Sequence, residues 1–293
     1  MEKRTFGKTG MEVSVLGFGG AEMGYGDVEQ STVDRMLGLA LDNGLNVIDT
    51  AECYHDSEGK IGRAVSHRRD DYFLFTKCGH SSGFDLPDWD PEMLRQSIDR
   101  SLQRLQTDRV DLVQLHSCSE EILRQGDVIR VLQEARDAGK TRFIGYSGDS
   151  TTALYAIQTG VFDSLQTSVS IADQECIDLT LAEAKAHQMG VIAKRPIANV
   201  AWIRGDTPGY HQQYAQRLLK LPYPFLEGAD AVETALRFTL AQHVDVAIVG
   251  TCQPDRWLSN AALAAKGPLP ADQVAEIRAI WAAHAEADWT GLQ

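Results

Sequence analysis

Residues 46–54 read Asn-Val-Ile-Asp-Thr-Ala-Glu-Cys-Tyr, and this stretch decides the fold. A short apolar run, Val47-Ile48, gives way abruptly to an acid, small residues and an aromatic hydroxyl. In a sheet built from repeated strand and helix units, such a break marks the carboxyl end of a buried strand, where these folds place their chemistry. The stretch therefore predicts that Asp49 and Tyr54 lie at the mouth of a site.

The same alternation of short apolar strands and amphipathic helices continues along the chain. The helix expected over 31–43 has Ser31 as its cap and Gly44 as its stop, and another begins at Pro91. Strands are expected to start near residues 14, 47, 72, 111, 142, 163, 191 and 246, and helices over 31–43, 57–65, 91–105, 121–138, 151–159, 175–188, 231–242, 254–265 and 271–285. Eight strands, each followed by a helix, predict a closed (β/α)8 TIM barrel.

The segments outside this repeat complete the predicted architecture. Residues 4–16 indicate a short N-terminal β-hairpin, the last two helices are additions at the C-terminus, and 199–228 is an irregular stretch. The glycines of Leu16-Gly17-Phe18-Gly19-Gly20 permit a tight backbone turn, but their spacing is not that of a dinucleotide fingerprint, and no helix is expected directly after them. No linker divides the chain, so 1–293 is predicted to be a single domain.

Composition excludes several classes of function. A net charge of −13 argues against nucleic-acid and anionic-membrane partners. The chain has no spanning apolar stretch and no secretion signal at its start, which predicts a soluble cytoplasmic protein. Five cysteines, without a Cys-x-x-Cys or His-x-His pair, predict reduced thiols and no metal site.

Two further strand ends carry reactive side chains. Lys77 follows Phe75-Thr76, and His116 follows Gln114-Leu115. A tyrosine is a poor acid at neutral pH, but a nearby ammonium favours its phenolate, and a carboxylate holds that ammonium charged and oriented. Lys77 and Asp49 suit these roles, and His116 suits a hydrogen bond to the Tyr54 oxygen or to the substrate. This arrangement predicts that the Tyr54 hydroxyl can donate its proton to the oxygen of a carbonyl substrate.

In these motifs the chain resembles the aldo-keto reductase family nearly from end to end. The resemblance rests on 17–20, on 49–54 with Ser57-Glu58 and Ile61-Gly62, on Thr76-Lys77, on 111–116, and on Gly139-Lys140 through 145–147. It implies a nicotinamide-dependent barrel whose catalytic tetrad is Asp49, Tyr54, Lys77 and His116. It also implies that NADPH or NADP+ is the cofactor, with NADH less favoured, and that the substrate is a small carbonyl compound.

The resemblance assigns cofactor contacts less evenly. Ser147 and Gln166 look like the residues that hold the carboxamide, although the usual following Asn is Gly148. Lys194-Arg195 stands where the family often has a stacking tyrosine, and Arg256 suits a 2′-phosphate because its planar fork matches phosphate oxygens. The cofactor-binding residues implied are Gly19, Gly20, Ser147, Gln166, Lys194, Arg195, Thr251, Arg256 and Asn260.

Plainer interpretations stand beside each assignment. Asp49 alone suits a helix cap, Lys77 a solvated strand end, His116 a core histidine and Arg256 a surface residue of a helix. An independent coincidence of such residues at three successive strand ends is much less probable, and this favours the joint site. Two other functions remain open: a Schiff-base lyase or aldolase using Lys77 or Lys194, and a nucleotide-binding regulatory barrel without turnover.

The pocket rim and the thiols carry weaker predictions. The rim is expected over 78–89 and 199–228, with aromatic side chains suited to an apolar or sugar-like carbonyl compound: Phe84, Trp89, Trp202, Tyr210, Tyr214, Tyr223 and Phe225. The short tail, 286–293, is expected to contribute little. Cys53, Cys78 and Cys118 lie near the mouth, either by chance or, as a sharper hypothesis, with pKa values lowered by Lys77 that would make them oxidant-sensitive. The oligomeric state is not predictable from the sequence.

Overall fold

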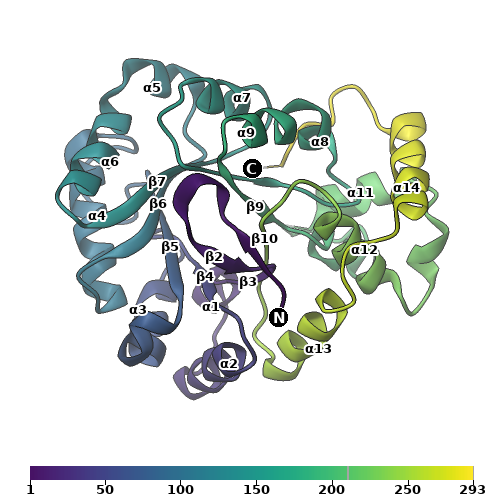
Figure 1. The fold of residues 1–293 in the computed structure, drawn as a ribbon, viewed down its shortest axis with the longest axis horizontal. Helices are drawn as coiled ribbons and strands as arrows, with labels where there is room; N and C mark the ends of the chain where they lie inside the picture. Colours follow the sequence, from purple (N-terminus) through teal and green to yellow (C-terminus); the bar gives the residue numbers. More distant parts are fainter. Residues whose placement is uncertain (210, 293) are drawn as a thin grey trace.

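Eight parallel strands close into a barrel with helices around it (Figure 1). The computed structural model describes residues 1–209 and 211–292, so Tyr210 and Gln293 lie outside the described residues. The closed order is β10-β3-β4-β5-β6-β7-β8-β9. These strands are β3 (Leu16–Gly19), β4 (Val47–Asp49), β5 (Phe73–Cys78), β6 (Val110–His116), β7 (Thr141–Ser147), β8 (Ser164–Ser168), β9 (Gly190–Lys194) and β10 (Val246–Val249). The predicted (β/α)8 barrel is confirmed.

The helices alternate with the strands as predicted, with differences at some helix ends. They are α1 (Ala21–Tyr25), α2 (Gln30–Asp42), α3 (Ser57–Val65), α4 (Pro91–Leu105), α5 (Glu120–Gln125), α6 (Asp127–Asp137), α7 (Ser150–Gln158), α8 (Glu175–Leu179), α9 (Leu181–Ala186), α10 (Ala201–Arg204), α11 (Gln212–Lys220), α12 (Ala231–Leu240), α13 (Pro254–Ala264) and α14 (Ala271–His284). Short 3-10 turns cover Gly7–Thr9, Ser66–Asp71, Ala198–Val200 and Pro224–Glu227.

Several expectations about helices were wrong. The helix expected over 175–188 is two helices, α8 and α9, and the stretch 199–228, expected to be irregular, contains α10 and α11. Ser31 lies inside α2, whose cap position is Glu29. The helix expected over 121–138 is two helices, because Gly126 between them has φ +81°, a left-handed conformation that favours glycine and ends α5. A short helix, α1, does begin directly after Gly20.

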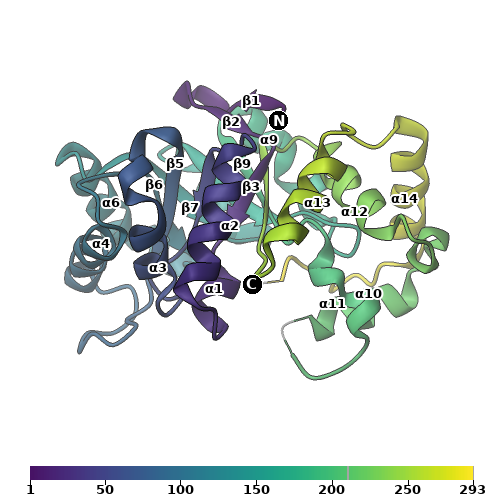
Figure 2. The same cartoon turned by 90° about the horizontal axis from the view of Figure 1, so that it is seen from below.

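The N-terminal hairpin closes the end of the barrel opposite the carboxyl ends of the strands. Its strands, β1 (Lys3–Thr5) and β2 (Glu12–Ser14), pair antiparallel, as predicted. Phe6 is fully buried and stacks on Phe75 of β5 with ring centroids 5.5 Å apart. Figure 2 shows the hairpin at one end and α1, α10 and α11 at the other. Because the hairpin covers the amino-terminal end, a ligand approaches through the opposite mouth.

A second apolar cluster packs beside the barrel. It joins Ile171 and Ala172, which follow β8, to α11, α12 and α14, and it includes the buried side chains of Tyr214, Tyr223 and Trp281. Tyr223 stacks on Phe225 with ring centroids 5.3 Å apart. These tyrosines therefore pack the irregular stretch rather than line a rim. Among the described residues, no helix is long and apolar enough to cross a membrane.

Candidate active site

A buried ion pair lies at the carboxyl ends of β4 and β5. Lys77 Nζ is 2.5 Å from Asp49 Oδ1 and donates to the carbonyl oxygen of Thr50 at 2.8 Å. Both side chains are 2% exposed, so neither is stabilised by water. Burial raises the pKa of Asp49, and the ammonium of Lys77 opposes that shift. The predicted pairing of these two strand ends is present.

Two aromatic rings cover the ion pair on the side of the mouth. Lys77 Nζ lies 5.2 Å from the ring centroid of Tyr54. The Tyr54 side chain is half-buried. His116 meets Tyr54 edge to face with centroids 5.6 Å apart, and its Nδ1 lies 3.3 Å from Cys53 Sγ. Burial, followed by the charge of Lys77, holds the pKa of His116 well below its usual range, so the imidazole is neutral at pH 7. The four predicted tetrad residues therefore meet at one place.

A layer of amides inside the barrel supports the ion pair. Gln114 Nε2 donates to Asp49 Oδ2 at 3.4 Å and to Gln166 Oε1 at 3.2 Å, and Gln166 Nε2 donates to Asp49 Oδ1 at 3.3 Å. The strand register sets this layer, because Lys77 pairs with Gln114 across β5 and β6. Gln114 was not among the predicted site residues. The spacing could have identified it: Gln114 is polar and precedes His116 by two positions, so the two side chains lie on the same face of the strand.

Close backbone contacts hold the Tyr54 loop in place. Ser57 Oγ donates to the carbonyl oxygen of Gly20 at 2.8 Å, and Gly20 N donates to the carbonyl oxygen of Asp49 at 2.8 Å. A Cβ on Gly24 of α1 would lie 2.0 Å from the carbonyl oxygen of Tyr54. These glycines let α1 approach the loop that carries the phenol.

Gly24→Ala is accordingly expected to displace Tyr54 and lower kcat by about 100-fold, since a misplacement of about 1 Å costs that much. Gly38→Ala is the matched control, because no atom lies within 4 Å of a Cβ at that position in α2. Steady-state kinetics on both variants measures the effect. Equal kcat values for the two alanine variants would contradict this role of Gly24.

Glu58 of α3 supports β5 from behind the site. Its side chain is fully buried and accepts a 2.6 Å hydrogen bond from Thr76 Oγ1. Burial raises the pKa of Glu58 to about 7. The folded protein therefore binds a proton that the unfolded chain releases near its ordinary pKa of 4.5, and stability falls as pH rises through this window.

We expect the native protein to lose up to about 3 kcal/mol more unfolding free energy between pH 5 and pH 8 than Glu58→Gln, which cannot ionise there. Denaturant unfolding at several pH values measures this difference. Glu121→Gln, at an exposed position on α5, is the control and should follow the native curve. A Glu58→Gln curve parallel to the native one would show that Glu58 is not the titrating group.

The thiols near the mouth are buried rather than activated. All five cysteines are free, as predicted. Burial raises the pKa of Cys53 to about 11 and that of Cys118 to about 12, and it also raises the pKa of Cys78. Lys77 only partly opposes the shift at Cys53. The hypothesis that Lys77 lowers a thiol pKa was therefore wrong, because desolvation outweighs the neighbouring charge.

Ser147 lies at the end of β7, buried and paired in register with His116 and Gln166. The next position has no room for a side chain, because a Cβ on Gly148 would lie 2.5 Å from Tyr146 Oη. That hydroxyl is held in place by donating to the carbonyl oxygen of Cys118 at 2.7 Å. This packing leaves no space for the Asn side chain that the family usually has at this position.

The cations at the end of β9 are already engaged. Lys194 Nζ lies 2.7 Å from Asp149 Oδ2, and both side chains are largely buried. Arg195 donates to Ser168 Oγ at 3.2 Å and to the carbonyl oxygen of Leu292. These two positions carry cationic side chains where the family often has a tyrosine.

The C-terminal tail reaches the barrel mouth, contrary to the expected minor contribution. Besides its bond from Arg195, Leu292 donates through its backbone N to Asp173 Oδ2 at 3.1 Å, and Gly291 N donates to Glu175 Oε2 at 2.7 Å. Arg217 Nη2 donates to the carbonyl oxygen of Thr290 at 2.7 Å. The end of the described chain is thus fixed beside β8 and β9.

The predicted adenosine segment forms the start of α13. Thr251 Oγ1 accepts from Gln253 N at 3.1 Å, Asn260 is buried and Arg256 is exposed. The charges of Arg256 and of Arg204 on α10 both act on Glu22 of α1. Arg204 was not predicted, because nothing in the stretch 199–228 indicated that its charge acts on the same carboxylate as Arg256.

The remaining predicted residues lie around the mouth of the barrel. Gly19 ends β3, where a Cβ would lie 3.3 Å from Gly250 N beyond β10. Trp89 covers Gly79, to whose carbonyl oxygen it donates its backbone N–H at 2.9 Å. Trp202 on α10 is partly buried against the second apolar cluster.

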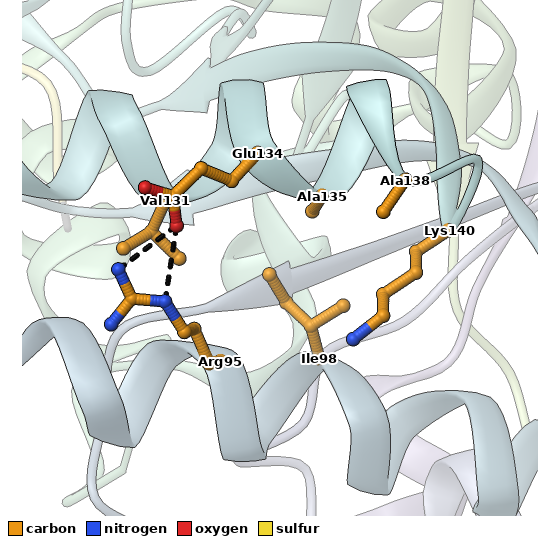
Figure 3. A pocket seen from close by; sticks show the side chains of 7 residues that line it. All are labelled: Arg95, Ile98, Val131, Glu134, Ala135, Ala138 and Lys140. Carbon is orange, nitrogen blue, oxygen red and sulfur yellow. Dashed lines mark hydrogen bonds and ion pairs between the residues drawn. The ribbon is translucent and has the colours of Figure 1, made fainter.

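Among the described residues, cavities also lie away from this site. One lies between α4 and α6 and has a volume of about 170 Å³. Figure 3 shows its lining residues, among them the ion pair of Arg95 and Glu134. A second, of about 310 Å³, is lined by residues of 224–234 and of α14. Neither is lined by a predicted catalytic or cofactor-binding residue, and the second includes Phe225, one of the aromatic residues predicted for the rim.

Comparison with known proteins gives a consistent result. The model of the aldo/keto reductase family matches residues 15–282. L-galactose dehydrogenase of Arabidopsis thaliana is 34% identical over 227 residues, 72% of this chain and 70% of that protein. The uncharacterized oxidoreductase YqkF of Bacillus subtilis is 30% identical over 207 residues, and the match spans 68% of this chain and 65% of that protein, just under two thirds of its length. The holo form of aldo-keto reductase AKR11C1 from Bacillus halodurans superposes with a TM-score of 0.80 at 25% identity, covering 96% of each chain.

Proposed function

Because this chain belongs to the aldo-keto reductase family, we propose that it interconverts a small aldehyde or ketone and its alcohol with NADPH or NADP+. Family membership itself makes the protein an NAD(P)H-dependent oxidoreductase. The observation that carries the finer proposal is the buried ion pair of Lys77 and Asp49 beneath Tyr54 and His116.

Each residue of the tetrad has a distinct task. Tyr54 donates its phenolic proton to the carbonyl oxygen and takes it back in the oxidation. Lys77 stabilises the phenolate that remains, because its charge lies 5.2 Å from the ring centroid. Asp49 keeps Lys77 charged and fixed, and the neutral His116 orients the substrate oxygen by a hydrogen bond. The bound nicotinamide supplies the hydride in reduction.

The residues at the mouth fit a dinucleotide. Asn199 Nδ2 is buried and has no hydrogen-bond partner among the described residues, so it is a donor available to a ligand. Ser147 and Gln166 are the residues that would face the carboxamide. Arg256 and Arg204 would hold the adenosine phosphates, which supports NADPH over NADH. Gly19, Gly20, Thr251 and Asn260 would form the surrounding wall, with Lys194 and Arg195 beside it.

The lysines argue against a Schiff-base enzyme. A lysine attacks a carbonyl as the free amine, whereas Lys77 and Lys194 each form a buried ion pair with an aspartate. The substrate proposed is a small carbonyl compound, with Trp89 and Trp202 on the rim. The name of the Arabidopsis relative, L-galactose dehydrogenase, makes aldoses one part of the panel to test.

Fluorescence titration with NADPH and NADH, followed by a panel of aldehydes, ketones and aldoses, tests the proposal. We expect NADPH to bind more tightly than NADH, Arg256→Ala to weaken NADPH alone, and turnover with at least one carbonyl compound. Binding of neither dinucleotide would overturn the cofactor assignment. Tighter binding of NADH would overturn the role of Arg256.

A further inference from the structure

Three metal-binding side chains converge at the mouth from separate segments. Cys53 follows β4, His80 follows β5 and His116 ends β6, and one ligand atom from each lies within 4.8 Å of the others. Cys53 Sγ and His116 Nδ1 are 3.3 Å apart, and the rings of His80 and His116 are 5.3 Å apart between centroids. The sequence offered no ligand pair at short spacing, because only the barrel closure brings these positions together.

We propose that Cys53, His80 and His116 bind a zinc-like divalent cation, and that the bound ion reversibly inhibits the enzyme. A thiolate and two imidazoles are a zinc ligand set, and three protein ligands leave the fourth position of the tetrahedron open. Tetrahedral zinc needs ligand atoms about 3.4–3.6 Å apart, which the Cys53 and His116 pair already meets within a few tenths of an ångström. The ligand atom of the third residue, within 4.8 Å of the others, has to close in by about 1.4 Å or less.

His80 is the ligand that can move, and its ring is already oriented. It lies in the loop after β5 with a side chain 38% exposed, and its Nδ1 is 3.1 Å from Asp88 Oδ2. Asp88 Oδ1 in turn accepts from Ser81 N at 2.7 Å, which fixes the carboxylate. A carboxylate on one ring nitrogen leaves Nε2 for the metal, and this arrangement is common around protein-bound zinc.

Inhibition follows from the place of His116 in the proposed mechanism. An ion on His116 holds the imidazole in the orientation that the metal requires rather than the one that the substrate oxygen would use, and it occupies space beside Tyr54. The thiol of Cys53 binds as the thiolate, and its proton passes to the solvent. This inhibition rests on the proposed function, whereas cation binding does not.

Cobalt titration of the chelator-treated full chain tests the site without measuring activity. We expect one equivalent of Co²⁺ to give thiolate-to-cobalt absorption and to be displaced by Zn²⁺. Cys53→Ser should abolish that absorption, and His80→Gln and Asp88→Asn should each weaken binding about tenfold or more. The matched controls are Cys252→Ser and His67→Gln, outside the trio, which should bind like the native chain.

A parallel assay then measures turnover in the presence of Zn²⁺. We expect zinc to inhibit the native enzyme, a chelator to restore it, and His80→Gln to retain turnover at zinc concentrations that inhibit the native chain. Thiolate absorption that survives in Cys53→Ser, or equal affinity in the native chain and His80→Gln, would overturn the site. Cobalt binding as described, in a protein without carbonyl turnover, would support the site and count against the proposed function instead.

Discussion

Lys77→Met is expected to abolish turnover and to destabilise the fold by about 3–5 kcal/mol, because it leaves the carboxylate of Asp49 buried without its counter-charge. The loss of turnover should be at least about 100-fold, since the charge that stabilises the Tyr54 phenolate is gone. Denaturant unfolding and steady-state kinetics measure the two effects separately.

Two further variants separate charge burial from catalysis. Lys77→Met combined with Asp49→Asn removes both charges and should recover much of the stability but none of the turnover. Lys140→Met breaks the solvent-exposed ion pair with Asp99 and should cost less than about 1 kcal/mol. An unfolding free energy of Lys77→Met equal to that of the native chain would contradict the burial of the Asp49 charge.

Tyr54→Phe is expected to reduce turnover by about 100- to 10,000-fold, because it removes only the hydroxyl that acts as the general acid. The ring remains, so its contacts with Lys77 and His116 and the binding of NADPH should persist. Rates under saturating cofactor and titrations of cofactor fluorescence measure both quantities.

Tyr25→Phe is the matched control for this experiment. Its ring lies 5.8 Å from that of Tyr54 between centroids and is 62% exposed. Removal of this second hydroxyl should leave the rate near that of the native enzyme. A comparable loss in both variants, or none in Tyr54→Phe, would show that the proton comes from another group.

The barrel, and the convergence of Asp49, Tyr54, Lys77 and His116 at one end of it, were predictable because both depend on local patterns. Apolar runs of strand length that end in Asp49, Lys77 and His116 indicate strand ends, and parallel strands in a barrel bring such ends together. Gln114 was missed because it lies within an apolar strand rather than after it, although its spacing from His116 places both on one face.

Other features depend on contacts between distant segments and could not be predicted. Leu292 contacts Arg195 across 97 positions, and no pattern in the tail indicates it. The pKa of the Cys53 thiol depends mainly on how deeply that side chain is buried. The sequence shows that Lys77 is near but does not show the burial. The trio with His80 likewise exists only once the barrel is closed.

The most direct test of the tetrad follows the label from NADPH deuterated at its transferable position into the product of an active carbonyl substrate. We expect one deuterium on the carbinol carbon with the native chain and about 100- to 10,000-fold slower product formation with Tyr54→Phe. A product without deuterium, together with a borohydride-trapped substrate adduct on Lys77 or Lys194, would contradict it and establish Schiff-base chemistry.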